Sequence, residues 1–547
     1  MTDGKRPGKR PDRRNRPFGP RPGGPGQGGR SGPPRKGGFL GRRDDRGRPG
    51  ERSARPNSGP RRPLPPITPR LLALRALRRL EQSRSLLVPD VLADPDIERH
   101  LDARGRRFLH ELVYGILRRR LTLDCIIAAY AREPISKLEP DCISVLRLGL
   151  YQLIFLSGVP PFAAISESVD LLGHCHAGVR ALANGLLRTV EREANVVERA
   201  LDRGGASPRK RLPLSEERLV FFSRSVFADP EQSRALHLAQ VHSVPAFLVE
   251  RWLARHDRAV VENMLEASNR KPRVSLRANL LRTDRDGLVR RLVAEGLSAA
   301  PGALPESVLV DGSPSDAVRT AAFREGLFYI QDEAAMKVAR ALAPRPGERV
   351  LDLCAAPGGK ATHLAELSAG QAEIVAVDRD QDRMLKLGEN CERLGLTTVT
   401  PLVFDPLALP GRGGPADLPE LLEDGFDAVL LDAPCSNTGV LARRPEVRWR
   451  VSLAAIRDLA EESRKLFSKA VRLVRPGGRL LFSTCSLEAE ENQDLVTRSL
   501  VANPALRQVK CEETLPSPGG PDGGFFALFE VEPFGSTTTP TASRTIG

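Results

Sequence analysis

The 547-residue chain has no long apolar run. None of its hydrophobic stretches approaches the ~20 consecutive apolar residues that a membrane-spanning helix needs. The first residues also lack the continuous apolar segment that a secretory signal peptide carries. The sequence therefore predicts a cytoplasmic protein with no membrane partner.

The eight cysteines show no pairing pattern. No two of them form a CxxC pair, and their spacing follows no regular framework. These absences argue against a structural zinc site and against a disulfide scaffold. We therefore expect no metal, and we expect free thiols in a reducing compartment.

Excess charge is missing from most of the chain. Residues 1–66 contain 19 Lys and Arg against 5 Asp and Glu, so they carry +14 of the total +15. The same segment is dense in Gly, Pro and Arg and has too little apolar surface to offset the entropy of ordering. It is predicted to be a disordered basic arm. The arm either binds RNA through its charge or serves only as a solubilising tail.

The next 260 residues or so divide into three parts. Between residues 67 and 195, apolar residues recur at helical spacing, as at Leu71, Leu74, Leu77 and Leu80, which predicts an all-α domain. Residues 196–216 are charged and are predicted to be a linker. Residues 217–326 mix helical patterns with short strands, including a strand within 272–279 and a helix over 285–295.

From residue 327 to 533 the pattern alternates strands and helices. Strands are predicted at 350–353, 374–377, 399–404, 428–431 and 479–483, and helices at 334–343, 359–369, 381–394 and 453–474. This alternation indicates an α/β domain with a mostly parallel sheet. A late strand at 525–531 is expected to be antiparallel at the sheet edge. Residues 534–547, rich in Thr and Ser, are predicted to be an unstructured tail.

Polar residues follow four of the predicted strands, where ligands bind in open α/β sheets. These residues are Asp378, Asp405, Asp432 and Cys485. The loop after the first strand has two adjacent glycines, which allow a tight turn and a close approach of a ligand to the backbone. Each aspartate taken alone could instead be a helix N-cap.

The loop contains no GxGxxG fingerprint, and the ligand predicted for it has no phosphate. That ligand is S-adenosylmethionine. Asp378 is placed for its ribose hydroxyls, Asp405 for its adenine amino group, and Asp432 for the cofactor or the substrate base. The backbone groups predicted to hold its amino-acid portion belong to Cys354, Ala355, Ala356, Pro357, Gly358, Gly359 and Lys360. Lys360 also either neutralises a nearby carboxylate or simply starts a helix.

Several segments resemble known families. Residues 352–360 (DLCAAPGGK) are similar to the cofactor motif of RNA cytosine-5 methyltransferases, and 432–436 (DAPCS) and 483–486 (STCS) match that family's two cysteine motifs. Residues 107–119 (RFLHELVYGILRR) and 146–153 (LRLGLYQL) resemble NusB-like RNA-binding domains. Beyond residue 67, the chain resembles bacterial 16S ribosomal RNA cytosine-5 methyltransferases.

The resemblance implies a Rossmann-like S-adenosylmethionine methyltransferase domain preceded by an all-α NusB-like domain. It implies methylation of C5 of a cytosine in small-subunit ribosomal RNA, with Cys485 as nucleophile and Cys435 assisting release of the adduct. Cytosine C5 is a poor nucleophile until a thiolate adds to C6. Asp432 would bind the cytosine edge or the cofactor. DNA cytosine-5 methyltransferases use a Pro-Cys thiol instead, which makes Cys435 the rival nucleophile.

Other interpretations remain open at this stage. The same chemistry would serve transfer RNA or another RNA, and a NusB-like domain also suits a non-catalytic assembly factor, although here both thiols and the cofactor loop are intact. Arg118, Arg119 and Arg120 are expected on an outer face, either as phosphate contacts or as solvated charges. Cys354 is expected to be structural, and nothing indicates more than a monomer. The cysteines without such context are Cys125, Cys142, Cys175, Cys391 and Cys511.

Overall fold

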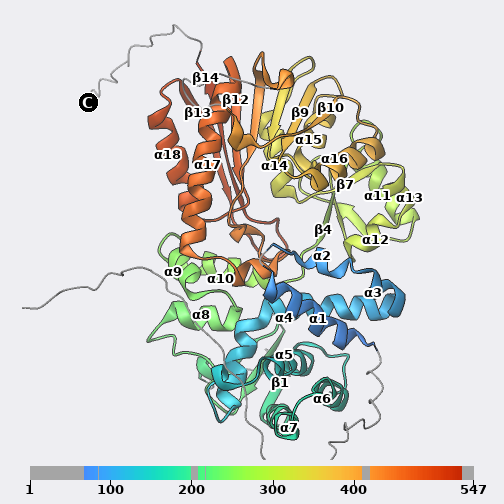
Figure 1. The fold of residues 1–547 in the computed structure, drawn as a ribbon, viewed down its shortest axis with the longest axis vertical. Helices are drawn as coiled ribbons and strands as arrows, with labels where there is room; N and C mark the ends of the chain where they lie inside the picture. The colour runs from blue at the N-terminus through green and yellow to red at the C-terminus, as the bar shows by residue number, and fades with distance from the viewer. Residues whose placement is uncertain (1–66, 84, 199–206, 216, 410–418, 533–547) are drawn as a thin grey trace, which may run out of the picture. The chain divides into compact units, whose positions relative to one another are not determined.

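A computed structural model of the chain describes residues 67–532, except residues 84, 199–206, 216 and 410–418 (Figure 1). The predicted arm at 1–66 and the predicted tail at 534–547 lie outside the described residues. Within the described part, no helix is both long enough and apolar enough to cross a membrane.

The front of the described chain is helical, as predicted. Its long central helix α4 buries Leu109, Leu112 and Val113 completely against the neighbouring helices. Asp102 caps the start of α4 by accepting a hydrogen bond from Gly105 N at 2.7 Å. The helices are α1 (Pro69–Gln82), α2 (Val88–Leu92), α3 (Pro95–His100), α4 (Ala103–Tyr130), the 3₁₀ turn η1 (Ile135–Lys137), α5 (Pro140–Phe155), α6 (Pro161–Asp170) and α7 (Ala177–Glu193).

A small antiparallel sheet follows, with the order β1-β3-β2. Its strands are β1 (Ala194–Glu198), β2 (Arg211–Pro213) and β3 (Arg218–Phe222), and the turn η3 (Pro208–Lys210) precedes β2. The segment 196–216, expected to be a linker, therefore contributes most of β1 and all of β2. The reason is local: Leu212 and Val220 pair across the sheet and are fully buried in the core of the helical domain.

A mixed segment connects this sheet to the α/β domain. It contains α8 (Arg234–His242), α9 (Ala246–Leu253) and α10 (Arg258–Asn269), followed by a four-stranded antiparallel sheet of order β5-β6-β4-β7. The strands are β4 (Val274–Ala278), β5 (Ala299–Pro301), β6 (Ser307–Val310) and β7 (Phe328–Ile330), and the helices are α11 (Arg285–Ala294), α12 (Pro314–Val318) and α13 (Ala321–Arg324). Strand β4 and helix α11 lie where the sequence predicts them.

The largest sheet has seven strands in the order β10-β9-β8-β11-β12-β14-β13. The first five strands in this order run parallel to one another, and β14 is antiparallel to both of its neighbours, β12 and β13. The strands are β8 (Arg349–Leu353), β9 (Glu373–Asp378), β10 (Val399–Val403), β11 (Phe426–Asp432), β12 (Val474–Thr484), β13 (Leu506–Thr514) and β14 (Gly524–Val531). The helices and turns around it are α14 (Glu333–Leu342), α15 (Gly359–Leu367), α16 (Gln381–Leu394), η4 (Pro406–Ala408), η5 (Glu420–Leu422), η6 (Thr438–Val440), η7 (Pro445–Trp449), α17 (Leu453–Leu473), η8 (Ala489–Glu491) and α18 (Gln493–Ala502).

The late strand β14 is antiparallel, as predicted, but it does not lie at the edge. Phe525 and Phe526, successive residues that face opposite sides of the sheet, are both buried. Such a strand is paired on both sides, here by β12 and β13. The true edge is β13, whose side chains are mostly exposed and include Lys510. Charged side chains of this kind are typical of edge strands.

Helices cover both faces of the large sheet, as Figure 1 shows. The alternation of successive side chains explains how each strand supports two cores. In β8, Val350 packs in the cluster that includes α14, α15 and α16, whereas Leu351 packs in the cluster with α17 and α18. The carboxyl ends of the parallel strands are thereby held in fixed positions between two buried layers.

Candidate active site

The loop from Cys354 to Gly358 connects the carboxyl end of β8 to α15. Ala355 N donates to Val377 O at 2.9 Å, and Gly358 N donates to Ala355 O at 2.8 Å, so the loop is fixed against the next strand. Gly358 has φ +98°, and a Cβ there would lie 2.8 Å from Cγ of Leu387. The tight turn therefore requires glycine at this position, as its place in the motif predicts.

Two predicted ligand-binding aspartates lie beyond neighbouring strands. Asp378 ends β9 and is buried; its carboxylate accepts hydrogen bonds from Ala356 N at 3.1 Å and from Asp380 N at 3.0 Å. Asp405 follows β10, is exposed, and caps η4 by accepting from Leu407 N at 2.9 Å. The structure thus places both at the predicted edge. Asp405 does act as a cap, and its role toward a ligand stays a prediction.

Asp432 lies at the end of β11, held by two partners. Lys360 Nζ is 2.5 Å from its Oδ2, and the Ser483 hydroxyl donates to its Oδ1 at 2.8 Å. Lys360 therefore neutralises a nearby carboxylate, one of the two roles considered for it. This contact joins the glycine loop to the strand that carries the first cysteine motif.

Asp352 is a buried carboxyl at the start of the 352–360 motif, and the sequence analysis assigns no role to it. Its side chain is fully buried in β8, and neither oxygen has a hydrogen-bond partner among the described residues. Burial raises its pKa well above the usual value, and the charge of Asp432 adds to this effect. The available signal was an acidic residue inside an otherwise apolar strand. The glycine loop, the acidic edge and this unpaired carboxyl suit a ligand with several hydrogen-bond donors, such as S-adenosylmethionine.

The two predicted thiols lie together. The sulfur atoms of Cys435 and Cys485 are 3.3 Å apart, although 50 residues separate them in sequence. Cys485 Sγ is also 3.2 Å from Oδ1 of Asn437, whose amide nitrogen donates to Cys435 O at 2.7 Å. Parallel strands β11 and β12 are adjacent, so the residues just beyond their carboxyl ends meet.

The electrostatics distinguish the two thiols. The pKa of Cys485 is lowered, chiefly by the hydrogen bond from the Cys435 thiol, with the cationic groups of Arg444 and Lys360 contributing and burial opposing. The pKa of Cys435 is raised well above its usual value by the same hydrogen bond and by burial. Because the thiolate is the nucleophilic form, the direction of these two shifts favours Cys485 over Cys435, and the role of Cys485 as nucleophile stays a prediction. Cys354 lies in the loop itself, where burial raises its pKa.

A buried polar network behind the thiols was missed by sequence reasoning. The carboxylate of Glu491 accepts hydrogen bonds from Ser436 N at 2.8 Å and from Ser436 Oγ at 2.6 Å. Ser436 Oγ is in turn 3.2 Å from Ser486 Oγ. Glu491 thus joins the residues that follow each cysteine. Burial raises its pKa to about 7.

Replacing Glu491 by glutamine is expected to flatten the pH dependence of stability. The carboxyl binds its proton more tightly in the folded chain, so its contribution to the free energy of unfolding is complete below the unfolded pKa of 4.5. That contribution is lost as pH rises through about 7. The rise of the pKa from 4.5 to about 7 corresponds to roughly 3 kcal/mol of free energy of unfolding. Glutamine keeps an acceptor for Ser436 N without ionising, so E491Q should be the more stable protein at pH 8.

Thermal unfolding of both proteins between pH 5 and 8 measures this effect. Glu490→Gln provides the control, because the partly exposed Glu490 is paired with Arg251 and its pKa is lowered rather than raised. Parallel melting curves for wild type and E491Q across this range would contradict the assignment.

Arg118, Arg119 and Arg120 do not form the outer face that the sequence analysis expected. Arg118 is buried and donates to Ala442 O at 2.8 Å, while the side chains of Arg119 and Arg120 stack over Phe155 and Trp449. The loop that follows the first cysteine motif covers this side of α4. Arg118 is therefore an internal contact between α4 and this loop, whereas Arg119 and Arg120 are half-buried and their role toward RNA stays a prediction.

Arg448, in η7 of that loop, adds further contacts between the loop and α4. It is fully buried and donates to the carbonyl oxygens of Arg118 at 2.9 Å and Ser243 at 3.0 Å. It also donates to Oδ1 of Asn269 at 3.0 Å and to the carbonyl oxygens of His242 and Ser268. One side chain thus ties the cysteine-bearing loop to α4 and to the mixed segment.

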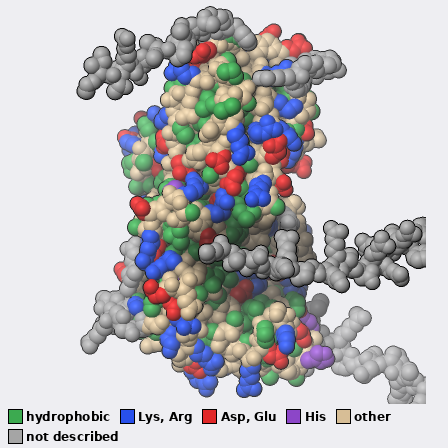
Figure 2. Space-filling model, turned by 90° about the vertical axis from the view of Figure 1, so that its left-hand side faces the viewer, with side chains coloured by type: hydrophobic (Ala, Val, Ile, Leu, Met, Phe, Trp, Pro, Cys, Tyr) green, Lys and Arg blue, Asp and Glu red, His purple; other side chains and the backbone are tan. Residues whose placement is uncertain are grey.

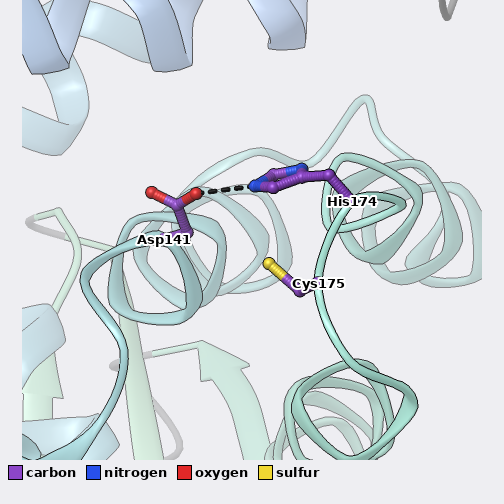
Figure 3. A group of neighbouring side chains, drawn as sticks. All are labelled: Asp141, His174 and Cys175. Carbon is purple, nitrogen blue, oxygen red and sulfur yellow. Dashed lines mark hydrogen bonds and ion pairs between the residues drawn. The ribbon is translucent and has the colours of Figure 1, made fainter. Parts of the chain in front are cut away.

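Within the described residues, one group of side chains has the composition of a metal site, and it lies in the helical domain (Figure 3). His174 Nε2 is 2.8 Å from Oδ2 of Asp141, and Cys175 lies beside them. Arg78 pairs with the other oxygen of the same carboxylate. These ion-pair contacts account for the arrangement. The prediction that methyl transfer needs no metal stays a prediction.

Side chains of both charge signs are interspersed over the surface in Figure 2. This distribution agrees with the near-neutral composition of the chain beyond its arm.

The sheet order, the glycine loop at the carboxyl edge and the paired thiols define a Rossmann-like methyltransferase. Residues 339–520 match the family described as 16S rRNA methyltransferase RsmB/F, residues 67–192 match the NusB family, and residues 244–315 match the ferredoxin-like domain of RsmF/B-like methyltransferases. The chain belongs to the 16S rRNA methyltransferase RsmB/F family. This finding confirms the family resemblance that the motifs indicated.

Similar proteins cover most of the chain. It is 34% identical over 453 residues to the probable ribosomal RNA small subunit methyltransferase B of Synechocystis sp., which covers 82% of this chain and 93% of that protein. It is 31% identical over 455 residues to the probable ribosomal RNA small subunit methyltransferase B of Bacillus subtilis, with 82% and 91% covered. The crystal structure of PH0851 superimposes with a TM-score of 0.65 at 26% identity, covering 85% of this chain and 99% of that one.

Proposed function

We propose that the protein methylates C5 of a cytosine in small-subunit ribosomal RNA through a covalent cysteine–C6 adduct. The observation that carries the proposal is the pair of sulfur atoms 3.3 Å apart at the carboxyl edge of the sheet, with the pKa of Cys485 lowered. The substrate follows from the relatives, which are named ribosomal RNA small subunit methyltransferases.

In the proposed reaction, the Cys485 thiolate adds to C6 of the cytosine and forms a C–S bond, which makes C5 nucleophilic. S-adenosylmethionine, when bound, supplies the methyl group that C5 takes up. The C5 proton then leaves to water, the C–S bond breaks, and its electron pair returns to Cys485. Asp432, fixed by Lys360 and Ser483, accepts a hydrogen bond from the cytosine amino group. The base must be unpaired or flipped out to reach the thiol.

Cys435 has a defined part in this scheme. Its sulfur lies 3.3 Å from that of Cys485, so the Cys435 S–H is positioned to donate to Cys485 when that sulfur is a thiolate. The same hydrogen bond stabilises the departing thiolate when the adduct breaks down. Cys435 therefore assists release without forming a bond to the base.

The proposed cofactor contacts use this chain's loop and acidic edge. Backbone groups of residues 354–360 would hold the amino-acid portion of S-adenosylmethionine. Asp378 would bind the ribose hydroxyls, and Asp405 the adenine amino group. The buried carboxyl of Asp352 lies directly before this loop and has no protein partner among the described residues.

The direct test is methyl transfer from tritiated S-adenosylmethionine to unmodified small-subunit RNA, with transfer RNA as a parallel substrate. Digestion of the RNA to nucleosides is expected to yield label in 5-methylcytidine from small-subunit RNA. Label in another nucleoside would contradict the C5 chemistry. Label found only in transfer RNA would mean that transfer RNA, and not small-subunit RNA, is the substrate. Cofactor binding without transfer to either RNA would favour an assembly factor.

A further inference from the structure

A cavity of about 300 Å³ lies beside the cysteine loops and is not used by the proposed chemistry. Helices α9 and α10 form one wall, and the loops around Gly439 and Pro516 form the other. Between them runs the segment that leads into β4, with Lys271, Pro272 and Arg273 at the cavity. Its volume is at the lower end of the range for small-ligand pockets.

The backbone that carries the nucleophile forms part of this cavity. Gly439, which lines it, donates its N–H to the carbonyl oxygen of Cys485 at 2.9 Å. A Cβ on Gly439 would lie 2.5 Å from the carbonyl oxygen of Gly523 and 2.8 Å from that of Cys485. Only glycine permits this close packing. A ligand in the cavity would therefore lie one backbone layer away from the reacting thiol.

The cavity has an excess of positive charge. Lys271 and Arg273 are exposed, and neither side chain makes an ion pair or a hydrogen bond to any other residue that the structure describes. The acidic residue that lines the cavity, Asp522, is already neutralised, because Arg443 Nε lies 2.5 Å from its carboxylate. The positive charges of Lys271 and Arg273 are therefore available to an anion.

The remaining walls are mixed, with proline and other apolar side chains interspersed with Ser268, Thr438 and Ser517. Pro272, Pro516 and Pro521 line the cavity together with Leu441 and Trp252. Trp252 is fully buried and its indole N–H is bound to Glu488, so this wall is fixed. Proteins hold single-stranded nucleotides by cationic side chains along the backbone and aromatic side chains under the bases. Here half-buried proline rings offer the surface beside the cations instead.

We propose that the cavity receives a nucleotide adjacent to the target cytosine, with its base against the proline walls and its phosphate at Lys271 and Arg273. This inference rests on the proposed function, because it assumes an RNA substrate. Its physical role is to hold the flanking backbone while the target base is out of the stack. Phosphate contacts of this kind fix register and position.

The test compares Lys271→Ala and the double variant Lys271→Ala/Arg273→Ala with wild type. Lys465→Ala on α17 is the matched control, since this exposed lysine lies outside the cavity. We expect the double variant to raise KM for RNA about tenfold, with kcat and S-adenosylmethionine affinity unchanged. Each lost phosphate contact should also reduce the slope of log affinity against log salt by about one.

RNA binding measured on filters at several salt concentrations separates this inference from the proposed function. If wild type transfers methyl groups but both variants match Lys465→Ala in KM and in salt slope, the cavity does not hold RNA. If wild type transfers no methyl group, the proposed function fails, and the salt slopes of the variants still decide whether the cavity binds RNA. RNA containing 4-thiouridine should cross-link to residues 268–273 or 516–522 of the wild type. The absence of cross-links from both segments would overturn the inference.

Discussion

Replacing Cys485 by alanine is expected to abolish both methyl transfer and the covalent protein–RNA adduct. The lowered pKa of Cys485 favours it as the thiolate of the pair, and without it we expect no sulfur to add to C6 of the cytosine. Loss of a covalent nucleophile typically costs roughly 10⁴-fold or more in turnover. Transfer of tritium from S-adenosylmethionine and adduct detection on denaturing gels measure the two effects on the same samples. Cofactor affinity should be unchanged in the variant.

Cys435→Ala is the matched variant, and its expected phenotype is different. Addition to C6 slows because the Cys485 thiolate loses the hydrogen bond that lowers its pKa. Release slows as well, because the departing thiolate loses the same donor, so adduct should accumulate on the gel while turnover falls. The opposite result, with no adduct in Cys435→Ala and normal transfer in Cys485→Ala, would identify Cys435 as the nucleophile, as in DNA cytosine-5 methyltransferases.

The pairing of the two thiols was predictable because it follows from sheet geometry. Each cysteine comes just after an apolar strand, and adjacent parallel strands bring their carboxyl ends together. The same reasoning placed Asp378 and Asp432 at that edge. Their positions depend on the backbone, which the alternation of strands and helices determines.

Other features depend on tertiary contacts that have no local signal. Glu491 lies in a polar stretch of sequence, and only the fold brings it beneath Ser436 at 2.6 Å. Arg118 looks like part of a solvated basic patch in the sequence, but the loop after Cys435 covers it and accepts its hydrogen bond at Ala442 O. Strand β13 lacks an apolar pattern because an edge strand buries little, so the late strand β14 was wrongly expected at the edge.

Replacing Arg448 by alanine is expected to lower the free energy of unfolding by about 3–5 kcal/mol. The fully buried guanidinium donates to five acceptors, and truncation removes that shared donor and opens a cavity, although His242 O keeps the amide of Asn269 as a donor at 2.7 Å. Because η7 lies between the cysteine loop and α4, the loop should also become sensitive to protease. Urea unfolding and limited proteolysis of residues 437–452 measure the two effects.

Arg450→Ala is the matched control, because Arg450 lies two residues away and, among the residues that the structure describes, donates only to Leu80 O and Ser83 O, each at 3.2 Å. Its replacement should cost about 1 kcal/mol. Equal stability of the two variants would mean that apolar packing of the loop, and not the buried arginine, holds it against α4. A larger loss for Arg448→Ala, with turnover falling before global unfolding, would show that the helical domain maintains the position of the loop that carries Cys435. That result would make the NusB-like domain a structural support of the candidate active site.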